Sequence, residues 1–149
     1  MALQEEYEFT SDWFSRSIDA WRRIFSARPA PSQILEIGSY EGRSTVWMIE
    51  NLLSERGGSL ITNDTWEEGA AGDIPLGQNQ TEMKFVEARF DRNISIATRR
   101  HPKVCVEKCK GHSTLLLSRL LAGGASGSFD LIYVDGSHRA PYVSRKRPN

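Results

Sequence analysis

Residues 33–53 read QILEIGSYEGRSTVWMIENLL, and this stretch decides the fold that the rest of the sequence predicts. It begins with an apolar run over residues 33–37 and continues through a turn bounded by Gly38 and Gly42. Three apolar residues then recur at the spacing of one helix face: Val46, Ile49 and Leu53. The stretch therefore predicts a strand, a tight glycine turn and a helix in succession.

A strand, glycine turn and helix in this order form the unit that binds nucleotides. The glycines let the backbone approach a ligand closely, and the first helical turn offers unpaired N–H groups. Glu36 stands two residues before Gly38. A carboxylate there would repel a pyrophosphate, so it favours a ligand that carries positive charge or donates hydrogen bonds.

The composition bounds the class of protein. The 149 residues suit one domain, and 19 basic against 19 acidic residues give no electrostatic footprint for nucleic acid or an anionic membrane. No apolar run approaches the roughly 20 residues that a membrane span needs, and the start MALQEEYEF is not a signal peptide. Two cysteines do not make a disulfide framework, so we expect a cytoplasmic protein.

Residues 11–27 predict a helix with Ser11 as its N-cap, ended by the RPAP sequence of residues 28–31. Its apolar face consists of Phe14, Ile18, Trp21 and Phe25. We expect this helix to dock on the core of the domain. A cap over the active site, or a face for a second copy in a homo-oligomer, is the alternative interpretation.

A second strand over residues 59–62 is expected to end at Asn63 and Asp64. Asp64 follows Gly42 by 64 − 42 = 22 positions. An acidic residue about 20 positions after the glycine turn, at the end of the next strand, is where a ribose diol is held. This spacing makes Asp64 a candidate ribose ligand, although such an aspartate can also be a simple turn residue.

The middle of the chain predicts a long loop over residues 67–80 and a helix over residues 81–94. The apolar face of that helix consists of Met83, Val86, Phe90 and Ile94. A third strand is expected over residues 104–108. One series of residues has the spacing of zinc ligands on a helix: His101, Cys105, Cys109 and His112. In an extended segment its ends lie too far apart for one ion, so we interpret the cysteines as ordinary thiols.

The end of the chain predicts a short helix over residues 114–121, capped by Ser113, and a strand over residues 129–134. The strand sequence FDLIYV is almost continuously apolar, as expected of a parallel strand covered on both faces. The fold class is therefore α/β with a parallel sheet. In such a sheet, ligands bind where strands end at their carboxyl side. Four segments fall at such ends: residues 36–42, Asp64, residues 111–113 and residues 135–138.

At this point the sequence resembles the class I S-adenosylmethionine-dependent methyltransferases, in particular the branch that methylates hydroxyls of small molecules. The resemblance covers residues 10–143. It rests on EIGSYEGRST at residues 36–45, NDTW at 63–66, KGHS at 110–113 and FDLIYVDGSH at 129–138. It implies a Rossmann-like fold, S-adenosylmethionine as cofactor and a small-molecule acceptor.

The resemblance also implies roles for individual residues. Four residues would surround the cationic methionine part of the cofactor: Glu36, Gly38, Ser39 and Gly42. Asp64 would bind the ribose hydroxyls, and Trp66 would pack beside the adenosine. The residues near the adenine edge would be Gly111, His112 and Ser113, where many relatives have an acidic residue in the last position.

Asp135 and His138 would face the methyl group that is transferred. In relatives that methylate hydroxyls, an aspartate at this position helps to hold a divalent cation such as Mg²⁺ or orients the acceptor. A cation would lower the pKa of an acceptor hydroxyl. Alternatively His138 would act as the general base, since the ordinary pKa of histidine suits proton removal near neutral pH.

The sequence departs from the family at its end. The family's sheet has strand order 3-2-1-4-5-7-6, of which only the first four strands, in the order 3-2-1-4, are expected here. We divide the chain into an N-terminal helical segment (1–30), an incomplete cofactor-binding domain (31–143) and a basic tail (144–149), and we expect a truncated form. Strand four would then be an uncovered edge.

Three hypotheses follow for the function. The first is a methyltransferase, in a truncated form with impaired activity; the second is a noncatalytic remnant that holds the cofactor. The third is the NAD-binding domain of an oxidoreductase. The third is disfavoured because the turn reads Gly38-x-x-x-Gly42 instead of G-x-G-x-x-G, and because Glu36 would face the pyrophosphate.

Overall fold

A computed structural model of the protein describes residues 6–67 and 80–136. The described strands are β1 (Gln33–Ile37), β2 (Gly58–Asp64), β3 (Val104–Lys110) and β4 (Leu131–Val134). The helical elements are η1 (Ser15–Ser17), α1 (Ile18–Ser26), α2 (Arg43–Met48), the π-helical segment η2 (Ile49–Leu53), α3 (Gln80–Arg100) and α4 (Ser113–Ala122). The strands form one parallel sheet in the order β3-β2-β1-β4, which confirms the predicted Rossmann-like arrangement.

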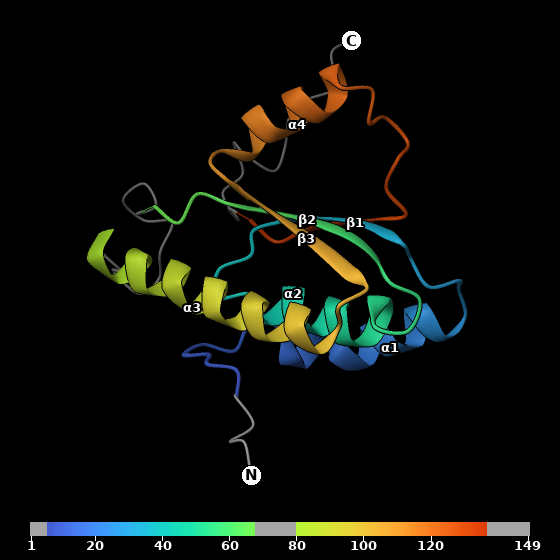
Figure 1. Cartoon of the computed structure of the whole chain (residues 1–149), viewed down its shortest axis with the longest axis horizontal. Helices are drawn as coiled ribbons and strands as arrows, with labels where there is room; N and C mark the ends of the chain where they lie inside the picture. Colours follow the sequence, from blue (N-terminus) through green and yellow to red (C-terminus); the bar gives the residue numbers. More distant parts are fainter. Residues whose placement is uncertain (1–5, 68–79, 137–149) are drawn as a thin grey trace.

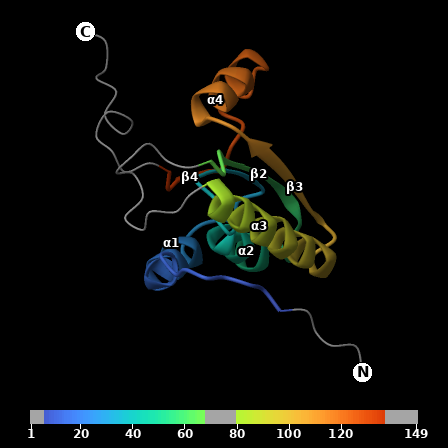
Figure 2. The ribbon, with the colours of Figure 1, turned by 90° about the vertical axis from the view of Figure 1, so that its left-hand side faces the viewer.

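The helices cover the two faces of the sheet unequally. Figure 1 shows α1, α2 and α3 on one face and α4 by itself on the other, and Figure 2 gives the same arrangement from the side. β1 pairs with β2 as far as the Ile37–Asn63 pair and with β4 as far as the Ile37–Val134 pair. The carboxyl ends of these three strands therefore lie together at one edge of the sheet, where parallel sheets bind ligands.

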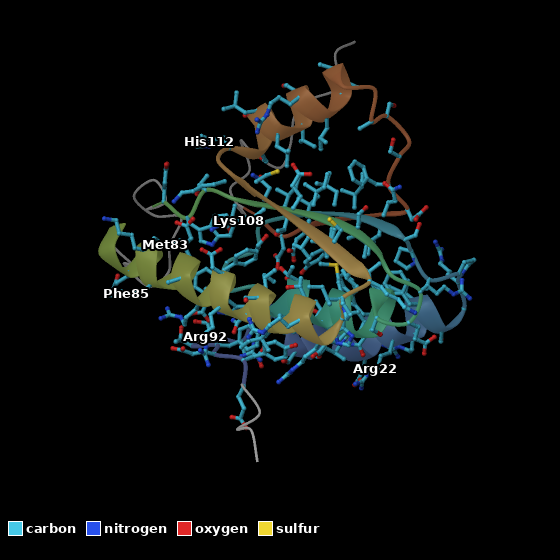
Figure 3. The ribbon with its side chains drawn as sticks, viewed as in Figure 1. Arg22, Met83, Phe85, Arg92, Lys108 and His112 are labelled. Carbon is cyan, nitrogen blue, oxygen red and sulfur yellow. The ribbon has the colours of Figure 1, made fainter. Side chains whose placement is uncertain are left out.

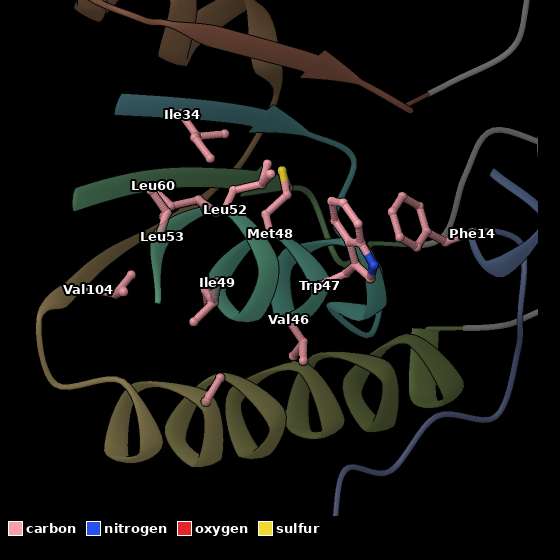
Figure 4. Close-up of a cluster of buried hydrophobic side chains, with 11 residues drawn as sticks. Phe14, Ile34, Val46, Trp47, Met48, Ile49, Leu52, Leu53, Leu60 and Val104 are labelled. Atoms are coloured by element: carbon pink, nitrogen blue, oxygen red, sulfur yellow. The ribbon is translucent and has the colours of Figure 1, made fainter. Parts of the chain in front are cut away.

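The larger core lies between the sheet and the helix that follows the glycine turn. Figure 4 shows Met48, Leu52 and Leu53 beside Ile34 and Leu60 of the strands. The predicted face of Val46, Ile49 and Leu53 is buried, with no more than 4% of any of these residues exposed. The apolar pattern of residues 46–53 thus fixes this helix against the sheet through burial of apolar surface.

The N-terminal helix docks on this core, as its apolar face predicts. Phe14 is buried against Trp47, and the rest of the face is partly buried against the same cluster: Ile18, Trp21 and Phe25. The predicted cap at Ser11 is wrong, because the helical segment begins only at Ser15. The side chain of Asp12 accepts a hydrogen bond from the Ser15 N–H at 2.9 Å, which satisfies a donor at the start of η1.

Two other helix boundaries differ from the predictions. α3 extends to Arg100 instead of residue 94, because Ile96 and Ala97 continue its buried face until Pro102 follows the helix. α4 includes Ser113 as its first residue, so the predicted Ser113 cap is wrong. His112 occupies the N-cap position and makes no side-chain capping bond.

β4 is covered on one face only by the described residues, contrary to the expectation for FDLIYV. Ile132 and Val134 are 55% and 67% exposed, whereas Tyr133, between them, packs toward the main core. α4 contributes Leu116 to a smaller cluster with Leu35 and Ile37 of β1 and does not bury β4. Among the described strands β4 pairs with β1 alone, so it lies at the edge of the sheet.

Candidate functional site

The glycine turn lies directly against the end of β4. Gly38 has φ +91°, a conformation that L side chains rarely adopt. A Cβ atom on Gly38 would stand 2.1 Å from the Asp135 carbonyl oxygen and 2.7 Å from the Gly136 nitrogen. The Asp135 N–H donates to the Ile37 carbonyl at 2.7 Å. Two segments that the sequence places 97 residues apart (135 − 38) are therefore packed backbone to backbone.

Gly42 ends the turn and begins the helix. Its φ is +81°, its N–H donates to the Ser39 carbonyl, and its own carbonyl accepts from the Val46 N–H, each at 2.8 Å. A Cβ atom on Gly42 would meet the Phe90 ring at 3.0 Å. Both glycines predicted for the cofactor turn are thus required by backbone conformation and by close packing.

Asp64 holds the glycine turn in place. Its Oδ2 accepts hydrogen bonds from the N–H groups of Ser39 and Tyr40, both at 2.9 Å, and its Oδ1 accepts from the Trp66 N–H at 3.0 Å. A carboxylate has about four lone-pair positions, so roughly one remains for a further donor. The structure brings Asp64 and Ser39 together, as the sequence predicts, and adds a role for Asp64 in fixing the turn.

Glu36 lies inside the protein, with no exposed surface. Its Oε1 accepts from the Ser44 hydroxyl at 2.5 Å, and its Oε2 accepts from the Thr45 and Thr62 hydroxyls at 2.5 and 3.0 Å. Burial raises the pKa of Glu36, and these hydrogen bonds oppose that shift without cancelling it. The carboxyl ties β1 to the start of α2 and to β2, and its contact with a cofactor stays a prediction.

Trp66 is a core residue in this structure. It has φ +46° and no exposed surface, its ring lies 4.8 Å from the Phe90 ring, and its indole N–H donates to the Tyr40 carbonyl at 2.9 Å. The Lys108 ammonium lies 4.6 Å from the centre of the Trp66 ring, reaching from β3 toward α3 (Figure 3). The structure gives this ring a packing role, and its predicted place beside an adenosine stays a prediction.

A cavity of about 500 Å³ lies where β2 and β3 end against α4. Gly111 and His112 line it, together with apolar side chains of α4, and His112 lies on the opposite side of the sheet from α3 (Figure 3). The side chain of Asn63 donates to the Cys109 and Gly111 carbonyls at 2.7 and 2.9 Å. Asn63, which also lines the cavity, thereby holds the backbone at the end of β3 in place.

Asp135 stands at the end of β4, beside the glycine turn. Its Oδ2 accepts a hydrogen bond from the Tyr133 hydroxyl at 2.9 Å, and the pKa of Tyr133 is raised by burial and by this carboxylate. Within residues 6–67 and 80–136, no group of three or more His, Cys, Asp or Glu side chains could hold a metal ion. His138, the predicted base, and most of the predicted loop over residues 67–80 lie outside the described residues.

Three polar residues that join the site together were not identified from the sequence: Glu41, Asn63 and Asn93. Each is at most 2% exposed and makes hydrogen bonds to distant segments. A charged residue between two turn glycines is a signal that could have identified Glu41. Asn63 and Asn93 carry no local signal, because their partners are backbone groups of distant segments.

The chain is similar to known proteins in sequence profile and in fold. Residues 35–147 match the sequence profile of a family described as a methyltransferase domain. A similar fold occurs in an O-methyltransferase from Bacillus cereus in complex with SAH (TM-score 0.51, 19% identity, 89% of this chain and 48% of that chain). Another similar structure is a putative O-methyltransferase from Klebsiella pneumoniae (TM-score 0.49, 23% identity, 85% of this chain and 46% of that chain).

The chain spans about half the length of these two structures, at 48% and 46% of their chains. At such identities the likeness concerns the fold. No curated protein gives a significant sequence match, and no helix in the described part of the chain is long and apolar enough to cross a membrane. The family profile covers most of the chain, including the glycine turn, Asp64 and Asp135. The chain belongs to the methyltransferase-domain family.

Proposed function

We propose that this protein binds S-adenosylmethionine at the carboxyl ends of its strands and transfers the methyl group to a hydroxyl of a small molecule. The observation that carries the proposal is the junction of the glycine turn, Asp64 and Asp135 at one edge of the sheet, in a chain of the methyltransferase family. The O-methyltransferase from Bacillus cereus is in complex with SAH, the product that S-adenosylmethionine leaves after methyl transfer.

The residues at this edge fit such a cofactor. Asp64 retains acceptor capacity for a ribose hydroxyl. The cavity at the end of β2 is lined by Gly111, His112 and apolar side chains of α4, with Ser118 and Arg119 among its polar groups, and it is the proposed place of the planar base. The close packing of Gly38 on Asp135 brings the turn proposed to hold the methionine part next to the residue proposed to face the acceptor. The noncatalytic remnant remains the alternative hypothesis.

When bound, S-adenosylmethionine supplies a sulfonium-linked methyl group that an acceptor oxygen can attack in line. The contribution of the protein is chiefly alignment, because the turn and Asp135 belong to one rigid junction. Asp135 would accept a hydrogen bond from the acceptor hydroxyl or share in holding a divalent cation. Alternatively, His138 would act as the general base that removes the hydroxyl proton.

The state of the two cysteines bears on the location of the protein. Cys105 is exposed and Cys109 partly so, and both thiols are free, which supports the cytoplasmic location that we propose. The acceptor is proposed to be a small molecule on the strength of the sequence resemblance to methyltransferases that act on small molecules.

Calorimetry tests the proposal directly. Titration with S-adenosylmethionine, S-adenosylhomocysteine and NAD should give saturable binding of the first two alone. Binding of NAD in place of both sulfur compounds would contradict the cofactor assignment. Transfer of a labelled methyl group to a panel of small phenols and alcohols then separates an enzyme from a remnant that only binds.

A further inference from the structure

The described N-terminal segment, residues 6–14, is attached to the glycine turn by a buried carboxylate. Glu41 lies between the two glycines of the turn, and only 1% of its side chain is exposed. Its Oε2 accepts from the Thr10 N–H at 2.7 Å, and its Oε1 accepts from the Thr10 hydroxyl at 2.6 Å and from Arg89 Nε at 2.5 Å. The side chain therefore joins the turn to the N-terminal segment and to α3.

A second buried residue repeats this connection. The side-chain amide of Asn93 on α3 donates to the carbonyls of Glu41 and Glu8, both at 2.9 Å, and its oxygen accepts from the Glu8 N–H at 2.9 Å. Arg43 adds a third contact, with its guanidinium 4.4 Å from the centre of the Phe9 ring. Figure 2 shows the segment passing along the outer side of α2 and α3.

Glu41 lies between two residues whose backbone conformation and hydrogen bonds define the turn. Tyr40, just before it, donates its N–H to Asp64, and Gly42, just after it, begins α2 in a left-handed conformation. A buried carboxylate is stable only when its hydrogen bonds are made, since loss of a partner leaves an uncompensated charge. Because Glu41 lies between Tyr40 and Gly42, its contacts with Thr10 and Arg89 restrain the part of the turn to which both residues belong.

We propose that Glu41 is a positioning residue for cofactor binding, which holds the turn in its binding conformation by anchoring it to the segment around Thr10 and to Arg89. The inference rests on the proposed function, because the turn is where the cofactor is proposed to bind. In this proposal the N-terminal segment supports the cofactor site indirectly, because it holds the turn that binds the ligand.

The test compares Glu41→Gln with Glu50→Gln in the full chain. An amide at position 41 has one acceptor oxygen, so it cannot accept from both the Thr10 N–H and Arg89 Nε, which bind different oxygens of Glu41. Glu50 also anchors the N-terminal segment, through the Tyr7 hydroxyl at 2.7 Å, but it lies in η2, away from the turn. The readouts are the Kd of S-adenosylhomocysteine by calorimetry and the hydrogen exchange of the Ser39 and Tyr40 amides.

We expect Glu41→Gln to weaken S-adenosylhomocysteine binding about tenfold and to speed exchange of the two turn amides, with Glu50→Gln unchanged in both. Thr10→Ala, which keeps the Arg89 pair, should act in the same direction to a smaller extent and serves if Glu41→Gln does not fold. Equal weakening by the Glu41 and Glu50 variants, or unaltered binding in folded Glu41→Gln and Thr10→Ala, would overturn the inference. A wild-type chain that does not bind S-adenosylhomocysteine would instead refute the proposed function.

Discussion

The Asp64 carboxylate accepts a hydrogen bond from the Ser39 N–H at 2.9 Å, so the end of β2 fixes the turn that follows β1. The same oxygen accepts from the Tyr40 N–H at the same distance. Because these two N–H groups are paired with Asp64, the backbone of the turn cannot reorient freely. The residue proposed to bind ribose is thus also a residue that orders the neighbouring part of the proposed cofactor site.

Asp64→Ala should reduce the affinity for S-adenosylhomocysteine by roughly 10- to 100-fold, because it removes both the ribose acceptor and the anchor of the turn. Calorimetry measures the change. Asp19→Ala is the matched control, since the Asp19 side chain is 88% exposed and pairs with Arg22 at 3.7 Å, far from the turn in the sequence. Equal affinities for the wild type and Asp64→Ala would remove Asp64 from the cofactor site.

Gly38→Ala should lower the free energy of unfolding by roughly 3 kcal/mol or more, because the new Cβ would stand 2.1 Å from the Asp135 carbonyl oxygen. Gly124→Ala provides the control. Gly124 also has positive φ, +78°, but a Cβ there has no atom within 4 Å, so only the backbone strain of about 1 kcal/mol applies. Urea unfolding of both variants should separate them clearly, and similar losses would refute the close packing of Gly38 on β4.

Glu36→Gln should change how stability depends on pH. The folded-state pKa of Glu36 is raised by burial above its ordinary value of 4.5. The stability that its protonated form contributes is therefore present below pH 4.5 and is lost as the pH rises through the folded pKa. A neutral amide does not titrate, so the variant should gain stability relative to wild type as the pH rises above 4.5.

Urea unfolding between about pH 4 and pH 8 measures this difference, with the exposed Glu55 changed to Gln as the control. The control variant measures how the removal of an exposed carboxyl alters the pH profile. If wild type and Glu36→Gln have parallel profiles, Glu36 does not carry a raised pKa in the folded protein.

Glu87→Gln should show the opposite dependence on pH. Glu87 accepts hydrogen bonds from Lys108 Nζ at 2.7 Å and Lys110 Nζ at 2.5 Å. Burial raises the pKa of Glu87, but the hydrogen bonds and charges of the two lysines together lower it below the ordinary 4.5. Its stabilisation is present above pH 4.5 and lost as the pH falls through the folded pKa.

We therefore expect Glu87→Gln to lose about 0.5–1 kcal/mol of unfolding free energy at about pH 7 and a smaller amount at about pH 3. Thermal or urea unfolding at the two pH values measures the loss. A loss of the same size at both pH values would mean that Glu87 stabilises the protein through packing and not through its charge.

Local patterns in the sequence account for much of the fold. The apolar run of residues 33–37 forms β1 as predicted, and the face of Val46, Ile49 and Leu53 is buried. Glycines at positions 38 and 42 mark the turn because only the backbone conformation of glycine suits it. Strand order follows from the family resemblance together with the parallel pattern, and the structure has that order.

Only the tertiary structure decided which partners the polar residues take. Glu36 and Trp66 sit at predicted ligand positions, yet hydroxyls surround the first and Phe90 and Lys108 cover the second. Glu41 gains its role from Thr10 and Arg89, which are 31 and 48 residues away in the sequence.

The physical reason for this division is the range of the interactions. Periodicity and glycine conformation act over a few neighbouring residues, so a sequence displays them directly. The partner of a buried carboxylate or indole depends on which distant elements pack against it, and so does the exposure of Ile132 and Val134 on β4. The stretch over residues 33–53 therefore determined by itself the strand, the glycine turn and the helix at the candidate site, and the packing of α3 and the N-terminal segment decided how that turn is held.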